Sequence, residues 1–205
     1  MKKLLITGFQ PFDGESVNPA LEVAKGLQGK TINGYDVIAR EIPVVRFEAL
    51  KAVQAAIEEV QPDAVIAIGQ AGGRPDITVE RVGINIDDFR IPDNKGNQPL
   101  DEPIVAGGPV AYWATLPIKK MVANIKAQGI PASVSNSAGT YVCNHLLYGL
   151  LHYLALHGQA VPAGFVHIPY LPQQMAVKNG KDAQCATMSL DTLLQGFAAM
   201  IAALK

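Results

Sequence analysis

The sequence predicts an α/β fold, more closely a three-layer α/β/α sandwich with a mixed, mostly parallel central sheet. Short apolar runs bounded by glycine or proline recur along the chain, and such runs are typical of buried strands. Longer segments between them carry apolar residues at helical spacing. Because strands and helices alternate, the strands are expected to lie mostly parallel, with helices covering both faces of the sheet.

Five strands are predicted from runs of apolar or small residues: 2–7, 35–42, 63–68, 132–137 and 165–168. The interval 78–87 interrupts the alternation and is predicted to be an extra strand or a hairpin. Residues 90–108 are rich in Pro, Gly, Asp and Asn, which predicts a long loop. Loops of that length in a compact domain are usually functional or disordered.

Five helices are predicted from apolar periodicity and end signals: 19–27, 46–60, 117–127, 144–156 and 189–204. Asn18 precedes Pro19, which combines a favourable N-cap with a proline at the first helical position. Gly129 and Gly158 follow two of the other helices and are expected to end them.

Composition favours one catalytic domain, residues 1–205, acting on a small and nearly neutral substrate. The chain is 49% hydrophobic and 17% charged, with a net charge of −1 and no segment of one sign, so neither nucleic acid nor a membrane is an expected partner. No apolar run approaches the roughly 20 residues that span a bilayer, and no signal peptide is recognisable. Two cysteines without metal-ligand spacing indicate a reduced, cytoplasmic protein with no metal site.

Cys143 is the most informative residue, because it ends a segment of small residues and begins a strongly apolar helical pattern. A helix start offers unpaired N–H groups and a partial positive charge, and both favour a thiolate. An ordinary thiol, with a pKa of roughly 8.5, is only a few per cent ionised at neutral pH. The position therefore predicts a nucleophile with a lowered pKa.

Cys143, His167 and Glu80 form a candidate triad. Each lies at or beyond the end of a predicted strand, where catalytic groups gather in open α/β sheets, and they supply a nucleophile, a base and an orienting carboxylate. Structural interpretations compete with this one. The cysteine would be a small buried apolar residue, the histidine a core residue bonded to a carbonyl, and Glu80 a surface ion-pair partner of Arg81.

The remaining histidines and the second cysteine are expected to have no chemical role. His145, His152 and His157 lie on or just after the apolar helix, with nothing nearby to complete a metal set. Cys185 lies in a polar segment beside no obvious base and is predicted to be a spectator thiol.

Two glycine-containing loops are candidate ligand contacts. Residues 69–75 lack the pattern of a phosphate-binding loop, so their glycines are expected to form a tight turn or to let the backbone approach a ligand. Phe9 and Phe12 lie in a loop after the first strand and are expected to cap the core or to clasp a flat apolar ligand.

Segments 8–19, 69–85 and 130–144 together resemble motifs of the type I pyroglutamyl peptidases, which are cytoplasmic cysteine peptidases. The resemblance implies hydrolysis of the amide after an N-terminal pyroglutamate through a thioester acyl-enzyme, without a cofactor. It implies that Cys143 is the nucleophile, His167 the base and Glu80 the partner that orients this base. Peptides with an N-terminal pyroglutamate are the implied partners.

The resemblance also implies a substrate pocket and an oxyanion site. The implied substrate-binding residues are Phe9, Phe12, Asn18 and Gln70. The two phenylalanines would sandwich the lactam ring and Gln70 would hydrogen-bond it. Arg90 would join the backbone N–H of Cys143 in holding the oxyanion. Bacterial members of the family usually form tetramers, so a homo-oligomer is expected.

Three positions depart from the family pattern: Ala20, Gly83 and Phe89. The aromatic ring of Phe89 is expected to narrow the leaving-group side of the site. Two other functions stay open from the residues alone. One is a different Cys-His-Glu amidase acting on a glutamine-type amide, and the other is a non-catalytic small-molecule-binding protein of the same fold.

Overall fold

The computed structural model describes residues 1–178 and 184–204. Within them, seven strands form one central sheet: β1 (Lys2–Phe9), β2 (Thr31–Ile32), β3 (Tyr35–Ile42), β4 (Ala64–Gln70), β5 (Ile77–Glu80), β8 (Ala132–Ser135) and β9 (Ala163–Ile168). Their order across the sheet is β2-β3-β1-β4-β9-β5-β8. Strands β3, β1, β4 and β9 are parallel neighbours. Strands β5 and β8 are parallel to each other, but β5 runs antiparallel to β9.

The predicted mixed, mostly parallel sheet is therefore confirmed, and the interval 78–87 proves to be two strands in different sheets. Strand β5 joins the central sheet, whereas β6 (Val82–Ile84) pairs with β7 (Ala111–Trp113) in a separate two-stranded sheet. The sequence did not indicate β2 or β7, which have only two and three residues. Strands this short carry too little apolar alternation to be recognised.

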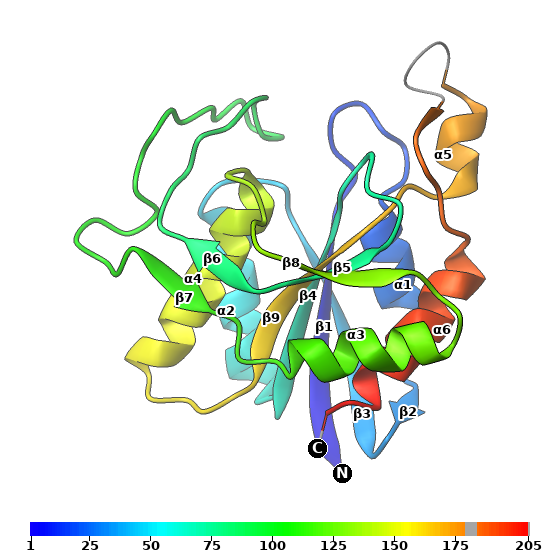
Figure 1. Ribbon diagram of the computed structural model, residues 1–205. Coiled ribbons are helices and arrows are strands. Elements are labelled where there is room, and N and C mark those ends of the chain that lie inside the picture. The colour runs from blue at the N-terminus through cyan, green and yellow to red at the C-terminus, as the bar shows by residue number, and fades with distance from the viewer. Residues whose placement is uncertain (179–183, 205) are drawn as a thin grey trace.

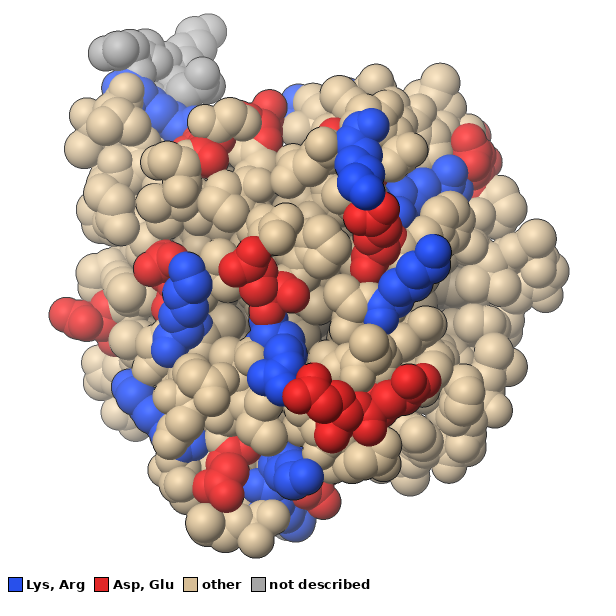
Figure 2. Space-filling view, turned by 180° about the vertical axis from the view of Figure 1, so that it is seen from behind, with Lys and Arg blue, Asp and Glu red and all other residues tan. Residues whose placement is uncertain are grey.

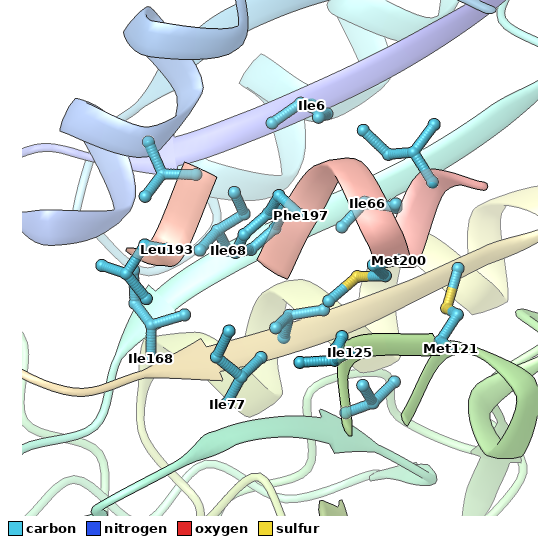
Figure 3. Close-up of a cluster of buried hydrophobic side chains, with 14 of the residues drawn as sticks. Ile6, Ile66, Ile68, Ile77, Met121, Ile125, Ile168, Leu193, Phe197 and Met200 are labelled. Atoms are coloured by element: carbon cyan, nitrogen blue, oxygen red, sulfur yellow. The ribbon is translucent and has the colours of Figure 1, made fainter. Parts of the chain in front are cut away.

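Helices cover both faces of the sheet, as predicted. Helices α1 (Pro19–Leu27), α3 (Ile118–Ala127) and α6 (Leu190–Ile201) pack on one face, and α2 (Glu48–Val60) and α4 (Val142–Leu156) on the other (Figure 1). Figure 3 shows how Phe197 and Met200 of α6 lie against Ile66 and Ile68 of β4. The short helix α5 (Pro172–Ala176) follows β9.

Local capping explains the helix starts that matter for the site. Helix α1 has its predicted bounds, because the Asn18 Oδ1 atom accepts from the N–H of Ala20 at 3.0 Å. Helix α4 begins at Val142, two residues before its predicted start, with Tyr141 as N-cap. Cys143 therefore lies within the first turn of a helix, as the sequence pattern indicated.

The surface carries no dominant charge on the face seen in Figure 2, where acidic and basic side chains are interspersed. None of the helices in the described residues is long and apolar enough to cross a membrane.

Candidate active site

His167 and Glu80 meet because β5 runs antiparallel to β9. Thr78 of β5 lies opposite His167 of β9, so Glu80, two residues further along, projects from the same face of the sheet and lies diagonally beside the histidine. The Nδ1 atom of His167 lies 2.7 Å from the Oε1 atom of Glu80. Glu80 is fully buried, so the alternative in which it forms a surface ion pair is wrong.

Arg74 holds Glu80 from the other side and was not singled out by the sequence. Its Nη1 atom donates to Glu80 Oε1 at 2.7 Å and to Thr78 Oγ1 at 2.6 Å, while Nη2 donates to the carbonyl of Ser137 at 3.1 Å. The guanidinium thus joins β5 to the loop that leads to the cysteine. Arg81, the expected partner, bonds Asn136 instead. The alternation of side chains along β5 was the available signal for this site, because it places Thr78 and Glu80, the two residues that Arg74 contacts, on the same face of the strand.

Cys143 of α4 lies over strand β4, which neighbours the strand that carries His167, β9. Gly69 is paired in register with His167, and a Cβ atom at Gly69 would lie 2.9 Å from the Cys143 sulfur. The same Cβ would lie 2.7 Å from Cζ of Phe165, whose ring centroid is 4.8 Å from that of His167. The absence of a side chain at position 69 is therefore what lets the sulfur approach the sheet.

The electrostatic environment of Cys143 differs from the expected one. Burial raises the pKa of the thiol to about 12, with a further increase from the negative charge of Glu80 and a small decrease from Arg74. The lowered pKa predicted from the helix start is thus wrong, because desolvation outweighs the favourable end of the helix. The Cys143 side chain is therefore a neutral thiol at neutral pH.

Burial and mutual contact shift the pKa values of both His167 and Glu80. Burial lowers the pKa of His167, although the Glu80 carboxylate opposes the decrease. Burial would raise the pKa of Glu80, but the hydrogen bond and charge of His167, with help from Arg74, lower it. A neutral imidazole that donates from Nδ1 to an ionised carboxylate has an unprotonated Nε2 atom, which can accept a proton.

A small, mostly apolar cavity of about 40 Å³ adjoins the cysteine. It is lined by all four substrate-binding residues that the sequence implied, together with the cysteine itself: Phe9, Phe12, Asn18, Gln70 and Cys143. The Phe9 ring packs against Phe165, and the Phe12 ring lies 6.2 Å from Tyr141.

The two amide side chains in this cavity are already partly engaged. Gln70 accepts at Oε1 from Gln174 at 2.9 Å, which leaves its Nε2 atom for a ligand carbonyl. Asn18 uses Oδ1 to cap helix α1 and Nδ2 to donate to the carbonyl of Gln10 at 2.9 Å. Asn18 therefore shapes the loop that carries Phe12 and has only one amide hydrogen left for a ligand.

A second cavity, of about 250 Å³, continues from the first. Phe12, Gln70 and Tyr141 line both cavities, and Arg90 lines the second with an exposed side chain. Phe89 is buried and lines neither, so the expectation that it narrows the leaving-group side is wrong. It packs edge-on against Tyr141 instead, at 4.8 Å between centroids.

Tyr141 lines both cavities, and the sequence did not identify it as a site residue. Its hydroxyl donates to the carbonyl of Pro92 at 3.1 Å, and burial raises its pKa to about 12. It therefore stays neutral and fixes the ring between the two cavities. Its position directly before the helix that carries Cys143 was the available signal.

His145, His152 and His157 were expected to be structural, and the hydrogen bonds of His152 and His157 agree with that prediction. His152 hydrogen-bonds Tyr112, and His157 bonds the carbonyl of Tyr153. Across residues 1–178 and 184–204, no group of three or more His, Cys, Asp or Glu side chains is arranged to hold a metal ion. Cys185 is unpaired, like Cys143.

The α/β fold and this grouping define a class of protein: a cysteine-type hydrolase with a pocket for a small uncharged group. Comparison with known proteins narrows the class. The family model described as pyroglutamyl peptidase matches residues 2–205. The pyrrolidone-carboxylate peptidase of Bacillus mycoides (strain KBAB4) is 54% identical over 196 residues, covering 96% of this chain and 89% of the relative. That of Bacillus cereus (strain Q1) is 55% identical with the same coverage.

Solved structures agree. A crystal structure of Bacillus amyloliquefaciens pyroglutamyl peptidase I has a TM-score of 0.94 and 45% identity, covering 99% of this chain and 96% of that one. A mutant pyrrolidone carboxyl peptidase from Pyrococcus furiosus gives a TM-score of 0.94 and 43% identity, covering 98% and 97%. The chain belongs to the pyroglutamyl peptidase family. The predicted family and cysteine-peptidase class are confirmed, and neither alternative function is favoured.

Proposed function

We propose that this chain removes an N-terminal pyroglutamyl residue from peptides, with Cys143 as nucleophile, His167 as base and Glu80 as the partner that orients the base. The observation that carries these roles is the 2.7 Å contact between His167 and the buried Glu80, together with a cysteine that lines a small, mostly apolar cavity. This contact fixes the tautomer in which Nε2 of the histidine accepts a proton.

The cavity supports pyroglutamate as the acyl group. The lactam ring is flat and uncharged, which suits an apolar space lined by Phe9 and Phe12, and the Nε2 atom of Gln70 is available to its carbonyl. A free ammonium group buried there would lack a countercharge at a cost of several kcal/mol. Selection for the ring over an open glutaminyl residue follows from that cost.

The reaction proceeds in two stages. The Cys143 sulfur attacks the pyroglutamyl carbonyl carbon while its proton passes to Nε2 of His167, because a thiol with a pKa of about 12 is not ionised beforehand. The backbone N–H of Cys143, at the helix start, and the Arg90 guanidinium hold the oxyanion. The imidazolium then protonates the departing amine, which leaves a thioester.

Water completes the cycle. His167 accepts a proton from a water molecule, whose oxygen attacks the thioester carbonyl. The second oxyanion collapses, the C–S bond breaks, and the proton returns from the imidazolium to the sulfur. Free pyroglutamate is released and the thiol is restored, so the whole reaction consumes one water molecule and needs no cofactor.

Purified protein tests the substrate assignment when it is offered pyroglutamyl, glutaminyl and prolyl amides of the same amine. We expect hydrolysis of the pyroglutamyl amide alone, because both other compounds carry a charged amino group. A preference for the glutaminyl amide would overturn the assignment.

We also propose that the chain forms a homo-oligomer, a tetramer by resemblance to its family. Val110, Trp113 and Leu156 are large apolar residues with highly exposed side chains. Trp113 also lines an apolar groove of about 340 Å³ between β7 and the end of α4. Exposed apolar surface of this kind supports a subunit contact. Sedimentation velocity tests the proposal, and a monomer at micromolar concentration would overturn it.

A single catalytic domain in the cytoplasm completes the proposal. The central sheet contains strands drawn from Lys2 to Ile168, and α6 near the end of the chain packs on it, which supports one domain. Both cysteines are free thiols, which is typical of a reducing compartment and supports the cytoplasm. Activity in the cytosolic fraction of cells that express the gene is the expected result, and activity confined to another fraction would contradict it.

A further inference from the structure

The structure contains a second buried acid–histidine pair, two residues beyond the nucleophile. His145 and Asp87 are both fully buried, and Nδ1 of the imidazole lies 3.0 and 2.8 Å from the two carboxylate oxygens. Arg46 donates from Nε to Asp87 at 2.8 Å. The backbone N–H of Phe47 donates to Nε2 of His145 at 3.0 Å. Since Nε2 accepts, Nδ1 carries the proton and donates it to Asp87.

This pair touches neither cavity of the site. Neither residue lines the space beside Cys143 or the larger cavity that contains Arg90. Both nitrogens of the His145 ring are already used, so the ring has no free atom with which to act as a base. Any influence on the reaction must therefore pass through the segments that the pair joins.

The pair joins the nucleophile helix to the segment that carries Arg90. His145 lies two residues after Cys143 on α4, and Asp87 lies three residues before Arg90. Hydrogen bonds of the neighbouring residue Asn144 join the same two segments. The buried side chain of Asn144 accepts from the N–H of Ile84 at 3.0 Å and donates to the carbonyls of Ile84 and Ile86 at 2.9 Å.

A third connection joins the segment before Arg90 to Thr140, which lies just before the helix α4. Asp88 and Thr140 exchange two hydrogen bonds, at 3.1 Å between the Asp88 N–H and the Thr140 carbonyl and at 2.7 Å from the Thr140 hydroxyl to the Asp88 carbonyl. Residues 84–88 are thus fastened to both ends of the turn that presents the cysteine. The exposed Arg90 lies two residues after this hydrogen-bonded segment.

We propose that Asp87 and His145 are positioning residues, which set the place of Arg90 relative to the Cys143 N–H and so complete the oxyanion site. Charged hydrogen bonds between two buried groups have narrow geometric limits, and a buried polar pair fixes one register where apolar packing would tolerate several. The proposal rests on the oxyanion role proposed above for Arg90.

A double-mutant cycle between His145 and Arg90 tests the proposal. We expect His145→Gln to lower kcat by about 10- to 100-fold with little change in KM, because misplacement by about 1 Å costs up to 10²-fold. The same substitution should lower kcat by less than about threefold when Arg90→Ala is already present. Asp87→Asn, which keeps the volume of the side chain, should follow the same pattern and supplies the cycle if His145→Gln fails to fold.

His152→Gln is the matched control, since it makes the same change two turns further along α4, at a residue that hydrogen-bonds Tyr112 and stacks on Tyr148. Its kcat should stay at the wild-type value. Alkylation of Cys143 by iodoacetamide should also be unchanged in His145→Gln, because Cys143, His167 and Glu80 are untouched.

Three results would overturn the inference: wild-type kcat in both pair variants, an equal loss with and without Arg90, or full activity in Arg90→Ala alone. All three leave the proposed substrate in place. A wild-type enzyme that ignores pyroglutamyl amides would instead overturn the proposed function.

Discussion

Gly69→Ala tests the placement of the nucleophile through a single methyl group. The added Cβ would lie 2.9 Å from the Cys143 sulfur and 2.7 Å from Cζ of Phe165. Ordinary carbon contacts begin at about 3.5–4.0 Å, so the sulfur and the new methyl must separate by about 0.6–1.1 Å. Phe165 is fully buried and cannot move away freely. The displacement therefore falls largely on the cysteine.

The expected effect is kinetic more than structural. A misplacement of about 1 Å costs up to 10²-fold in rate, so kcat for a pyroglutamyl amide should fall by about 10- to 100-fold. Overpacking of this kind typically costs about 1–3 kcal/mol in the free energy of unfolding, which leaves the variant folded at 25 °C. Stopped assays of hydrolysis and urea unfolding curves measure the two quantities.

Gly26→Ala is the matched control on the opposite face of the sheet. Its Cβ would lie equally close, at 2.9 Å, to Cδ2 of Leu194, which is the far end of a flexible side chain. Helix α1 gains helix propensity from the change, and kcat should stay at the wild-type value. The reasoning fails if folded Gly69→Ala retains kcat within about twofold of wild type and reacts normally with iodoacetamide.

Further expectations concern the base, its partner and the pH dependence. His167→Ala should lower kcat by about 10²–10⁴-fold, and Glu80→Gln should lose less, because orientation is worth less than proton transfer; an equal loss in both variants would contradict the assigned roles. Because burial lowers the pKa of His167 and the base must be neutral, kcat/KM should fall with decreasing pH at a midpoint below 6.5; a midpoint above that value would contradict the protonation state. Burial would raise the pKa of Asp93, but hydrogen bonds from Arg46 and Asn97 lower it, so its folded pKa lies below the unfolded value. Its stabilisation is present above about pH 4 and is lost as the pH falls through the folded pKa. Urea unfolding should therefore show Asp93→Asn less stable than wild type by about 1–3 kcal/mol at pH 7, with a deficit that shrinks as the pH falls below about 4. A deficit that stays constant below about pH 4 would contradict the linkage.

The fold was predictable wherever local signals were strong. Asn18 and Pro19 predicted the start of α1, because a side-chain cap and a fixed φ angle act within two residues. The pairing of Glu80 with His167 was suggested by residue type, but its geometry depends on β5 running antiparallel to β9. Chain direction is set by contacts between residues 87 positions apart, and no local pattern encodes them.

The thiol shows where local reasoning fails. The helix start at Cys143 predicted a lowered pKa, but burial raises it, and that burial comes from packing against residues distant in sequence, such as Gly69. The role of Arg74 was missed for a similar reason. It reaches Glu80 across a glycine turn, whereas sequence proximity had favoured Arg81. The raised pKa of Cys143 and the role of Arg74 both depend on tertiary packing, which composition and residue spacing do not predict.

Trapping the acyl-enzyme tests the central claim most directly. In the Cys185→Ser variant Cys143 is the remaining cysteine of the chain, so a thioester has one place to form. Acid quenching during turnover of a pyroglutamyl substrate, followed by peptide mass mapping, should find the pyroglutamyl group on Cys143. Hydrolysis at the wild-type rate with no adduct on that residue, or with an adduct elsewhere, would contradict the account.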